Sequence, residues 1–391
     1  MKLLFVTFYF PPDLSAGSFR ATALVDALLE RGPRDLQIDV LTTVPNRYHT
    51  FTHQVAEVER RPNVEIRRIA LPPHHNDMPG QARAFAAFAR RVLRHAGSAR
   101  YDLVFATSSR LMTAALAAAA ARRAKARLYI DLRDIFVDTM NDVLPAGFKW
   151  PVHFLFDRVE RWTVAQADRV NLVSRGFEGY FRRRYPGREF RFITNGIDEE
   201  FATAGSSAAA PPDARPGVVR IVYAGNIGEG QALHGIVPEL ARRLDGRAQF
   251  IVIGDGGRKA ALAAAVAGLR NVELRPPMAR AGLLDVYRDA DVLFLHLGAL
   301  PAFEKVLPSK LFEYAALGKP ILAGVSGHAA DFIRAEIDNA AVFRPLDAAG
   351  AVRALESLAL TTTPRPGFVA KFARARLSRE LADDILAVAA G

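Results

Sequence analysis

The sequence predicts an α/β protein made of two doubly wound, Rossmann-like domains, and three observations lead to this expectation. Short apolar segments typical of buried parallel strands alternate with helical segments along most of the chain. This alternation stops at residues 202–217, which are rich in Ala, Ser, Gly and Pro, and it starts again after them. The length of 391 residues is too great for one ordinary domain and suits two.

The break sets the expected domain boundaries. We predict a first domain at residues 1–201, a linker at 202–217, a second domain at 218–365 and a helical segment at 366–391, for which packing back on the first domain is one option. Open α/β sheets bind ligands beyond the carboxyl ends of their strands, and an interface between two domains is the usual place for a site. We therefore expect the two domains to face each other across a cleft.

The first domain begins with the order of elements that is typical of a mononucleotide-binding half. A strand at residues 2–8 leads into a loop containing Gly17, and a helix at 19–30 and a strand at 37–42 follow. Gly17 can let the backbone approach a ligand, and we place Arg20, in the first turn of the helix, in the same ligand-binding set. No GxGxxG motif accompanies Gly17, so a plain turn is an equal alternative.

Two charged residues, Arg133 and Asp134, follow the strand predicted at residues 128–132. They therefore lie at the carboxyl end of that strand, at the edge where ligands bind. Asp134 is suited to act as a base or to orient a hydroxyl group, and Arg133 is suited to pair with it. A purely structural salt bridge between the two is the alternative.

The second domain has its most informative stretch after the apolar strand at residues 292–295. Pro308 and Ser309 open a helix there, with Ser309 at the N-cap position, and Gly318 ends the helix. This arrangement places the loop before the helix at the carboxyl edge of the second sheet.

That loop has the composition of an anion site. Lys305, Ser309 and Lys310 combine positive charge with helix amide groups, so a phosphate or diphosphate is the expected ligand. Glu313, about one turn into the helix, can accept hydrogen bonds from sugar or ribose hydroxyl groups. The alternative is a capped helix whose lysines are solvated.

The positive charge of the chain is the next observation. The formal net charge is +11, which favours an anionic partner, although an arginine- and alanine-rich source genome explains it equally well. Residues 81–95 predict an amphipathic helix with phenylalanines on one face and arginines on the other. A core-facing apolar stripe with a solvated basic face is the usual interpretation, and a helix on an anionic membrane surface is the alternative.

Several classes of protein are disfavoured by what the sequence lacks. It contains no cysteine, so disulfides and thiolate metal sites are excluded. No apolar run approaches the roughly 20 residues that span a bilayer, and no cleavage site follows the first strand, so we expect a cytoplasmic protein that does not cross the membrane. Asp289 and Asp291 form a DxD pair at a helix-to-strand junction, where capping is the expected role, and we predict no metal site.

Taken in order, these motifs resemble the GT-B glycosyltransferases, specifically the large retaining family four, over nearly the whole chain. Each motif is weak alone, but their order and spacing together are specific. Residues 133–134 and 303–314 are further similar to the fucosamine-transferase-like branch of bacterial surface-polysaccharide assembly. The stretches that carry the resemblance are 10–12 with Gly17, 195–198, 223–228, 253–256, 287–292, and 308–314 with 318–320.

The sequence departs from the family pattern at three positions. The family usually has two glutamates separated by seven residues, and here Lys305 stands at the first position while Glu313 keeps the second. Asn226 and Gln231 stand where the family usually has an arginine and a lysine. We infer that Lys305 and Lys310 supply the missing positive charge from the opposite loop.

The resemblance implies a retaining, metal-independent transfer of a hexosyl or amino-sugar group from a nucleoside-diphosphate sugar to a hydroxyl acceptor. The acceptor would be a glycan or a lipid-linked glycan at the inner face of the cytoplasmic membrane. The implied partners exclude nucleic acid, and no cofactor is needed beyond the sugar nucleotide. The implied site residues are Asp134 and Lys305 for catalysis, Arg133 for the acceptor side, and Gly17, Arg20, Gly225, Asn226, Gln231, Leu307, Pro308, Ser309, Lys310 and Glu313 for the donor.

Three other functions stay open at this point. A sugar-nucleotide 2-epimerase uses the same two-domain arrangement and needs no acceptor. A non-catalytic donor-binding subunit is compatible with Lys305 and Asn226 at their unusual positions. A dinucleotide oxidoreductase is disfavoured, because neither half combines GxGxxG with an acidic residue about 20 positions further on.

Overall fold

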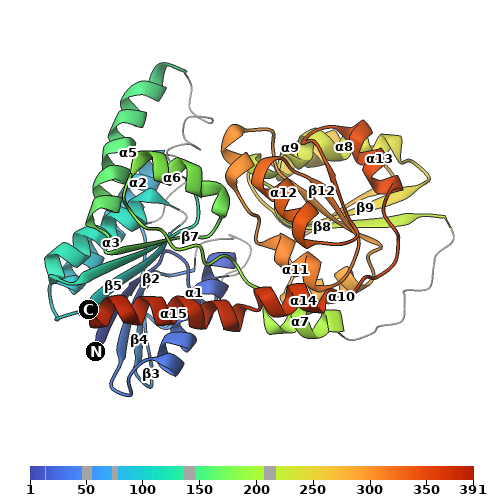
Figure 1. The fold of residues 1–391 in the computed structure, drawn as a ribbon. Helices are drawn as coiled ribbons and strands as arrows, with labels where there is room; N and C mark the ends of the chain where they lie inside the picture. The colour runs from blue at the N-terminus through green and yellow to red at the C-terminus, as the bar shows by residue number, and fades with distance from the viewer. Residues whose placement is uncertain (14, 46–54, 73–77, 109, 136–145, 207–216) are drawn as a thin grey trace. The chain divides into compact units, whose positions relative to one another are not determined.

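The chain folds into two units in the computed structural model, which describes residues 1–13, 15–45, 55–72, 78–108, 110–135, 146–206 and 217–391. The first unit comprises Met1–Asn195 together with Arg374–Gly391, and the second unit comprises Gly196–Ala373 (Figure 1). Both are α/β structures with a sheet between helices, and each is described below by itself.

The first unit contains a seven-stranded sheet in the order β3-β4-β2-β1-β5-β6-β7. All neighbours pair in parallel except β3 and β4, which are antiparallel. The chain works outward from β1 in one direction and then, from β5, in the other, which creates a switch point between β1 and β5. The strands are β1 (Lys2–Val6), β2 (Gln37–Thr43), β3 (Val58–Arg61), β4 (Val64–Ile69), β5 (Leu103–Ser108), β6 (Arg127–Leu132) and β7 (Arg169–Leu172).

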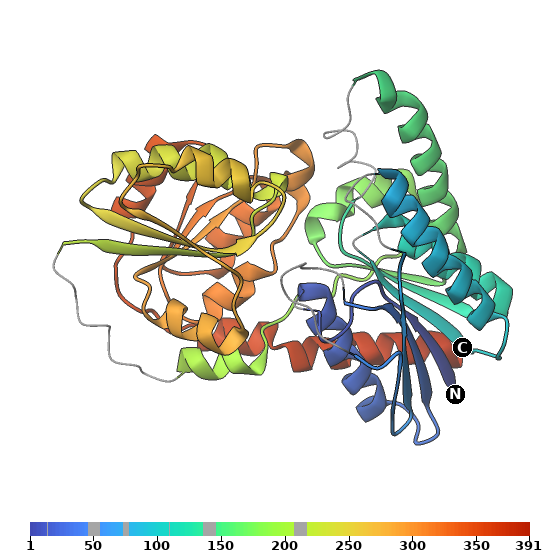
Figure 2. The same cartoon turned by 180° about the vertical axis from the view of Figure 1, so that it is seen from behind.

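Helices cover both faces of this sheet. Figure 2 shows α1 and α15 on one side, and α2, α3 and α5 on the other. Helix α1 begins where Ser15 caps it, since the Ser15 hydroxyl oxygen accepts a hydrogen bond from the Ser18 amide at 3.2 Å. The helices are α1 (Ala16–Arg31), α2 (Met78–Ala96), α3 (Leu111–Ala124), α5 (Ala146–Gln166), η1 (Arg175–Phe177), α6 (Glu178–Arg184) and α15 (Arg374–Ala390).

The second unit contains a six-stranded sheet in the order β10-β9-β8-β11-β12-β13, with every pair parallel. The strands are β8 (Val219–Asn226), β9 (Ala248–Asp255), β10 (Val272–Arg275), β11 (Val292–His296), β12 (Ile321–Gly324) and β13 (Ala340–Phe343). All residues of the inner strands β11 and β12 are buried, as expected for parallel strands covered on both faces.

Helices α8, α9 and α13 enclose the main core of the second unit on one face of its sheet, and α10, α11 and α14 lie on the other (Figure 1). The helices are α7 (Glu199–Ser206), η2 (Glu229–Gln231), α8 (Leu233–Arg243), α9 (Lys259–Ala265), α10 (Arg280–Arg288), η3 (Pro301–Lys305), α11 (Lys310–Ala316), α12 (Gly327–Glu336), α13 (Ala348–Glu356) and α14 (Pro366–Phe372).

The boundaries of the two units differ from those expected from composition. Residues 196–201 belong to the second unit, and residues 202–206 continue α7 instead of opening a linker. The small residues there allow α7 to pack closely on α11, because a Cβ atom at Gly205 would collide with the Ala316 carbonyl. The remaining linker residues, 207–216, lie outside the described residues. Helix α14 falls in the second unit and α15 in the first.

A buried ion pair ties the centre of the first unit together. The Arg20 guanidinium donates to both carboxylate oxygens of Asp131, at 2.9 and 3.0 Å, and to the carbonyls of Ile193 and Thr194. Asp131 is fully buried, and it also accepts hydrogen bonds from Thr107 and Asn171. Burial raises the pKa of Asp131, but Arg20 and these hydrogen bonds outweigh burial and hold the pKa below its usual value.

This arrangement changes the interpretation of Arg20. Sequence reasoning placed Arg20 among the residues that bind the donor, but its side chain is only 4% exposed. Its donors are directed at Asp131 and at the segment after β7, so the structure gives it a role inside the fold.

We expect Asp131→Asn to lower the free energy of unfolding of the first unit by about 3–5 kcal/mol, because the buried Arg20 charge then loses its counter-ion. The matched control is Asp383→Asn, which removes an exposed partner of Arg31 and is expected to cost less than about 1 kcal/mol. Urea unfolding of both variants measures the difference. Equal shifts of the unfolding midpoint in the two variants would contradict the central role of the buried pair.

Candidate functional site

The loops after β8, β9 and β11 meet at the carboxyl edge of the second sheet, because these three strands are neighbours. The backbones of β8 and β9 are crowded there. Gly225 lies opposite Gly254, and a Cβ atom at Gly254, whose φ is +149°, would collide with the Gly225 carbonyl. Glycine is therefore required at this edge for steric reasons as well as for its backbone angle.

The loop after β8 is held by its own polar side chains. The Asn226 side-chain amide donates to the Gln231 side-chain oxygen at 2.8 Å, and the Gly228 amide donates to the same oxygen at 3.3 Å. The Tyr223 hydroxyl donates to the Asn226 carbonyl at 2.6 Å. Asn226 and Gln231 thus bind each other, and neither brings a positive charge to the loop.

A buried histidine forms a hydrogen bond to the backbone of the same loop. The ring of His296, at the end of β11, lies 2.7 Å from the Gln231 carbonyl through Nδ1, and its Nε2 accepts a hydrogen bond from the Leu346 amide at 3.0 Å. Nε2 therefore carries no proton, and Nδ1–H donates to the carbonyl. Burial lowers the pKa of His296 to about 4, so the ring stays neutral at physiological pH.

Lys310 brings a positive charge next to this loop. It is the first residue of α11, and a Cβ atom at Gly225 would collide with its side-chain Cε. The lysine stem therefore passes directly over Gly225, which brings the ammonium group to the carboxyl end of β8. Burial lowers the pKa of Lys310, and the Arg280 charge lowers it further, while Glu313 opposes both effects.

The remaining predicted residues of the β11–α11 connection lie around Lys310. Lys305 ends η3 and is half-buried, Leu307 is buried, and Pro308 is half-buried. Ser309 occupies the N-cap position of α11 as expected, although its backbone is already helical and its side chain makes no capping hydrogen bond.

Glu313 belongs to a cluster of charges that sequence reasoning missed. The Arg280 guanidinium lies 3.5 Å from the Glu313 carboxylate and forms ion pairs with Asp198 and Glu200. Burial lowers the pKa of Arg280, but the three carboxylates outweigh burial and raise it. No local pattern could reveal Arg280, because its partners lie far from it in the sequence.

The first unit brings Gly17, Arg133 and Asp134 together. Arg133 and Asp134 follow β6 directly, and a Cβ atom at Gly17 would collide with Arg133 Nη1. Burial lowers the pKa of Arg133 to about 10, and the nearby Arg20 charge lowers it in the same direction. Burial raises the pKa of Asp134 to about 6, although Arg133 opposes the shift.

Two unsatisfied polar atoms belong to residues beside Gly17. Within the described residues, Ser18 Oγ and Arg133 Nε are buried without a hydrogen-bond partner, and Arg133 is the residue that Gly17 contacts. Native proteins leave few such atoms. Among the described residues, no group of three or more His, Asp and Glu side chains is arranged to hold a metal ion.

Two protein families match most of the chain. Residues 17–196 match the family described as "Glycosyl transferase 4-like domain", and residues 219–360 match "Glycosyl transferases group 1". A curated relative, "Putative colanic acid biosynthesis glycosyl transferase WcaI" from Escherichia coli (strain K12), is 36% identical over 100 residues. That match spans 25% of this chain and only 24% of the relative.

Solved structures share the fold over the whole chain at low identity. Sucrose-phosphate synthase from Thermosynechococcus elongatus has a TM-score of 0.68 and 15% identity, covering 100% of this chain and 96% of its own. Anabaena Alr3699/HepE in complex with UDP and glucose has a TM-score of 0.67 and 16% identity, covering 99% of both chains. Trehalose 6-phosphate synthase from Burkholderia multivorans has a TM-score of 0.69 and 15% identity, covering 100% of this chain and 99% of its own.

The predicted fold class, two Rossmann-like α/β domains, is confirmed by the two parallel sheets and by these structural neighbours. Residues 17–196 and 219–360 each match a glycosyltransferase family, and the chain has the GT-B fold.

Proposed function

We propose that the protein is a retaining glycosyltransferase that moves a sugar from a nucleoside-diphosphate sugar to a hydroxyl group of a glycan or lipid-linked glycan. The observation that carries this proposal is the edge of the second sheet, where Lys310 crosses Gly225 next to the Arg280–Glu313 pair. The edge combines a cation for a diphosphate with an oriented carboxylate for a ribose. Structures titled as HepE complexes with UDP and with UDP-glucose, which share the fold, add support.

The cations at this edge are suited to the leaving diphosphate. In glycosyl transfer the diphosphate gains negative charge in the transition state, so positive groups held beside it favour the reaction. Lys310 is fixed in place by its passage over Gly225, and Lys305 approaches the same connection from η3. These two lysines replace the cations that the loop of Asn226 and Gln231 does not supply.

The carboxylate of Glu313 is suited to the ribose. Arg280 holds it from one side, and Asp198 and Glu200 hold Arg280 in turn. A carboxylate oriented in this way can accept hydrogen bonds from two neighbouring hydroxyl groups. We assign the ribose to Glu313 on this ground.

The first unit supplies the residues for the acceptor side. Asp134 is a carboxyl group with a pKa raised to about 6 by burial, which suits it to orient or deprotonate a hydroxyl group near neutral pH. Arg133 packs on Gly17 beside it. No residue is assigned as a covalent nucleophile, which suits a front-face displacement.

The finer assignment is to surface-polysaccharide assembly, in the fucosamine-transferase-like branch. The name of the E. coli relative, which refers to colanic acid biosynthesis, supports this class of pathway. A lipid-linked acceptor would place the enzyme at the inner face of the cytoplasmic membrane. Within the described residues, no helix has the length and apolar character needed to cross a bilayer, so this contact would be peripheral. No observation favours an epimerase or a non-catalytic subunit.

We expect one nucleoside diphosphate among UDP, GDP and dTDP, tested together with CMP and NAD, to raise the melting temperature of the protein. Saturation at 100 times the dissociation constant adds about 2.7 kcal/mol of stability, which a thermal-shift assay resolves. Lys310→Met is expected to abolish most of the shift, whereas the exposed control Lys371→Met in the same unit keeps it. Failure of every diphosphate to shift the melting temperature would favour a non-catalytic role.

The ribose assignment has a sharper test. If Glu313 accepts a hydrogen bond from the 2′-hydroxyl group, the wild-type protein should bind the selected ribonucleotide about tenfold more tightly than its 2′-deoxy form. Glu313→Ala should bind both forms equally, whereas the exposed control Glu356→Ala should keep the preference. Titration calorimetry measures the four affinities. If Glu313→Ala weakens both nucleotides by the same factor, the preference for the ribonucleotide remains. That result would show that the carboxylate does not contact the 2′-hydroxyl group.

We expect the Asp134 carboxylate to lower the stability of the folded protein at neutral pH while it supports the transfer reaction. Its pKa is about 6 in the folded protein against 3.8 in the unfolded chain, so the folded state binds the extra proton and loses stability as the pH rises from about 4 to 6. Asp134→Asn should therefore raise the free energy of unfolding at pH 8, by up to about 3 kcal/mol, and leave it unchanged at pH 4.

The same Asp134→Asn substitution should lower the rate of sugar transfer at least 100-fold, because general-base assistance is worth about that much. Asp383→Asn, on the surface of the same unit, should change neither property. An Asp134→Asn protein that is fully active at pH 8 would rule out the proposed catalytic role.

A further inference from the structure

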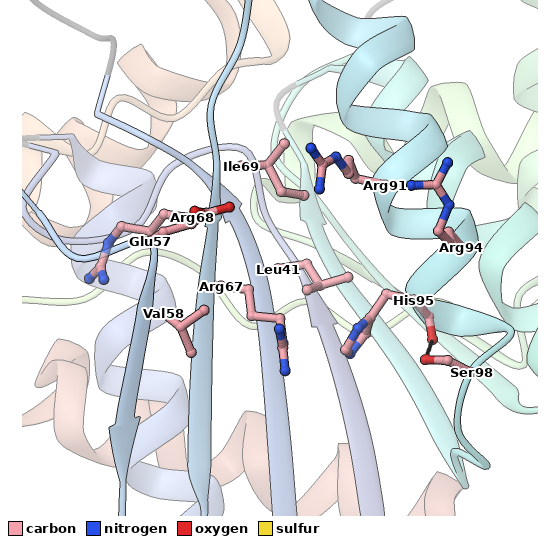
Figure 3. A pocket seen from close by; sticks show the side chains of 10 residues that line it. All are labelled: Leu41, Glu57, Val58, Arg67, Arg68, Ile69, Arg91, Arg94, His95 and Ser98. Carbon is pink, nitrogen blue, oxygen red and sulfur yellow. Dashed lines mark hydrogen bonds between the residues drawn. The ribbon is translucent and has the colours of Figure 1, made fainter.

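A basic hollow lies in the first unit, between the C-terminal half of α2 and the face of β4 (Figure 3). Its volume is about 280 Å³. We call it the basic groove and define it by Leu41, Val58, Arg67, Ile69, Arg91 and Arg94, which belong to β2, β3, β4 and α2. All of these residues lie in the first unit, so the groove shares no residue with the nucleotide site proposed in the second unit.

The two walls of the groove differ in chemistry. On the sheet side, Arg67 pairs with Leu41 of β2 and with Val58 of β3 in the register of the sheet. Ile69 lies two residues further along β4 and therefore on the same face, so apolar side chains surround Arg67. On the helix side, Arg91 and Arg94 are three residues apart and therefore adjacent on the surface of α2. Figure 3 shows both arginines on the helix wall, with Arg91 extending toward Ile69.

Neighbouring carboxylates neutralise only part of the positive charge of this groove. Glu57 is the single acidic residue among those that line it in the described structure. Arg67 forms an ion pair with Glu65, and Arg68 pairs with Glu59. Arg91 and Arg94 are exposed and form no ion pair with any described residue, so two guanidinium groups remain available at the mouth.

The helix dipole explains only part of this arrangement. Basic residues in the last turn of a helix are stabilised by the carboxyl-terminal end of the dipole, and Arg94 and His95 occupy the last turn of α2. Arg91 lies before that turn, and Arg67 faces the groove from a strand. A dipole preference therefore does not account for arginines on both walls around an apolar floor.

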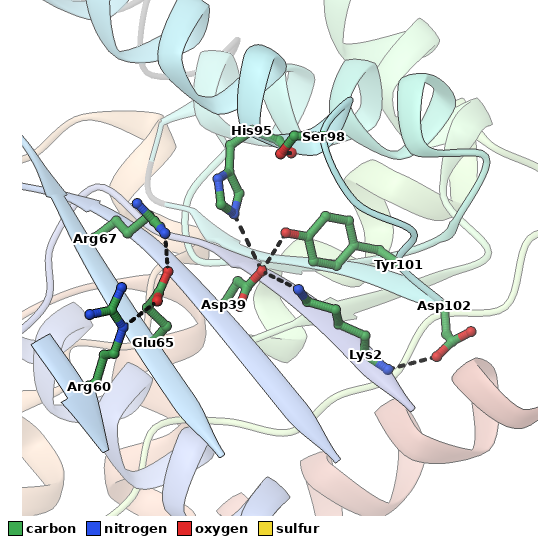
Figure 4. A network of polar contacts seen from close by, with 9 residues as sticks. All are labelled: Lys2, Asp39, Arg60, Glu65, Arg67, His95, Ser98, Tyr101 and Asp102. Carbon is green, nitrogen blue, oxygen red and sulfur yellow. Dashed lines mark hydrogen bonds and ion pairs between the residues drawn. The ribbon is translucent and has the colours of Figure 1, made fainter. Parts of the chain in front are cut away.

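The inner end of the groove is rigid. His95 lies 3.3 Å from the Asp39 carboxylate through Nε2, and the same oxygen accepts hydrogen bonds from Tyr101 at 2.5 Å and pairs with Lys2 at 3.0 Å (Figure 4). Burial raises the pKa of Asp39, but these partners outweigh burial and hold the pKa at about 2. The Asp39 carboxylate therefore stays charged at physiological pH and holds His95, which lines the groove.

We propose that the basic groove binds a phosphate monoester that carries a short apolar group. The phosphate contacts the guanidinium groups of Arg91 and Arg94, and the apolar group lies against Leu41, Val58 and Ile69. Arginine forks match the oxygens of a phosphate better than lysine does, and adjacent guanidinium groups can share one dianion. A volume of about 280 Å³ suits a small ligand and not a folded partner.

The test is titration calorimetry of the full-length protein with hexyl phosphate, inorganic phosphate and hexanol. A saturating nucleoside diphosphate is present throughout, so that the site in the second unit is filled. Hexyl phosphate is expected to bind at least tenfold more tightly than inorganic phosphate, and hexanol is expected not to bind. The double substitution Arg91→Ala/Arg94→Ala should weaken hexyl phosphate at least tenfold.

The matched control removes the same charge from the same helix. Arg83 and Arg90 are exposed on α2 and do not line the groove, so Arg83→Ala/Arg90→Ala should change the affinity less than twofold. Equal weakening in both double variants would overturn the proposal, because the general field of the helix would then explain binding. Absence of hexyl phosphate binding to the wild-type protein would overturn it as well.

A second arm separates a soluble ester from a lipid headgroup. Vesicles containing phosphatidic acid are sedimented with each variant. We expect the two double variants to lose vesicle binding equally, because a bilayer meets the whole basic face of α2. The contrary result is that only Arg91→Ala/Arg94→Ala loses vesicle binding and that the wild-type protein does not bind hexyl phosphate. This result would assign the two arginines to membrane binding and overturn the small-molecule proposal.

Discussion

The candidate site depends on one constraint: parallel strands place all their carboxyl ends at the same edge of a sheet. In the second unit this edge joins β8, β9 and β11, whose following loops are distant in sequence. The backbones of β8 and β9 approach so closely that a side chain is excluded at Gly254. At Gly225 the side chain of Lys310 takes the space of a Cβ atom, so the glycine leaves room for the cation that the proposed reaction needs.

The charged residues near the two sheet edges fall into two groups. Some are neutralised by ion pairs inside the fold, and others have pKa values shifted by burial. Arg20 and Asp131 neutralise each other inside the first unit and hold the segments that end near Gly17. Arg280 is shared among three carboxylates in the second unit and thereby orients Glu313. Lys310 and Asp134 instead have pKa values shifted by burial toward their neutral forms, which is the usual condition of groups that act on a ligand.

Sequence reasoning succeeded where the signal was local. The alternation of strands and helices predicted both sheets, and a strand followed by Gly or by charged residues located Gly225, Lys310 and Asp134 at the correct edges. It failed where the deciding contact was distant. Arg280 was missed because its partners are Asp198 and Glu313, and Arg20 was misassigned because Asp131 lies 111 residues away. The linker was placed too early because small residues in α7 serve close packing on α11.

The central claim is that the second unit holds the nucleoside diphosphate at the Lys310–Glu313 edge. A crystal structure of the protein with the diphosphate selected by thermal shift tests this most directly. The account predicts the diphosphate within hydrogen-bonding distance of Lys310 and the ribose on the Glu313 carboxylate, with the Arg280 contact intact. A nucleotide bound elsewhere, or one that leaves Lys310 and Glu313 without contact, would contradict it.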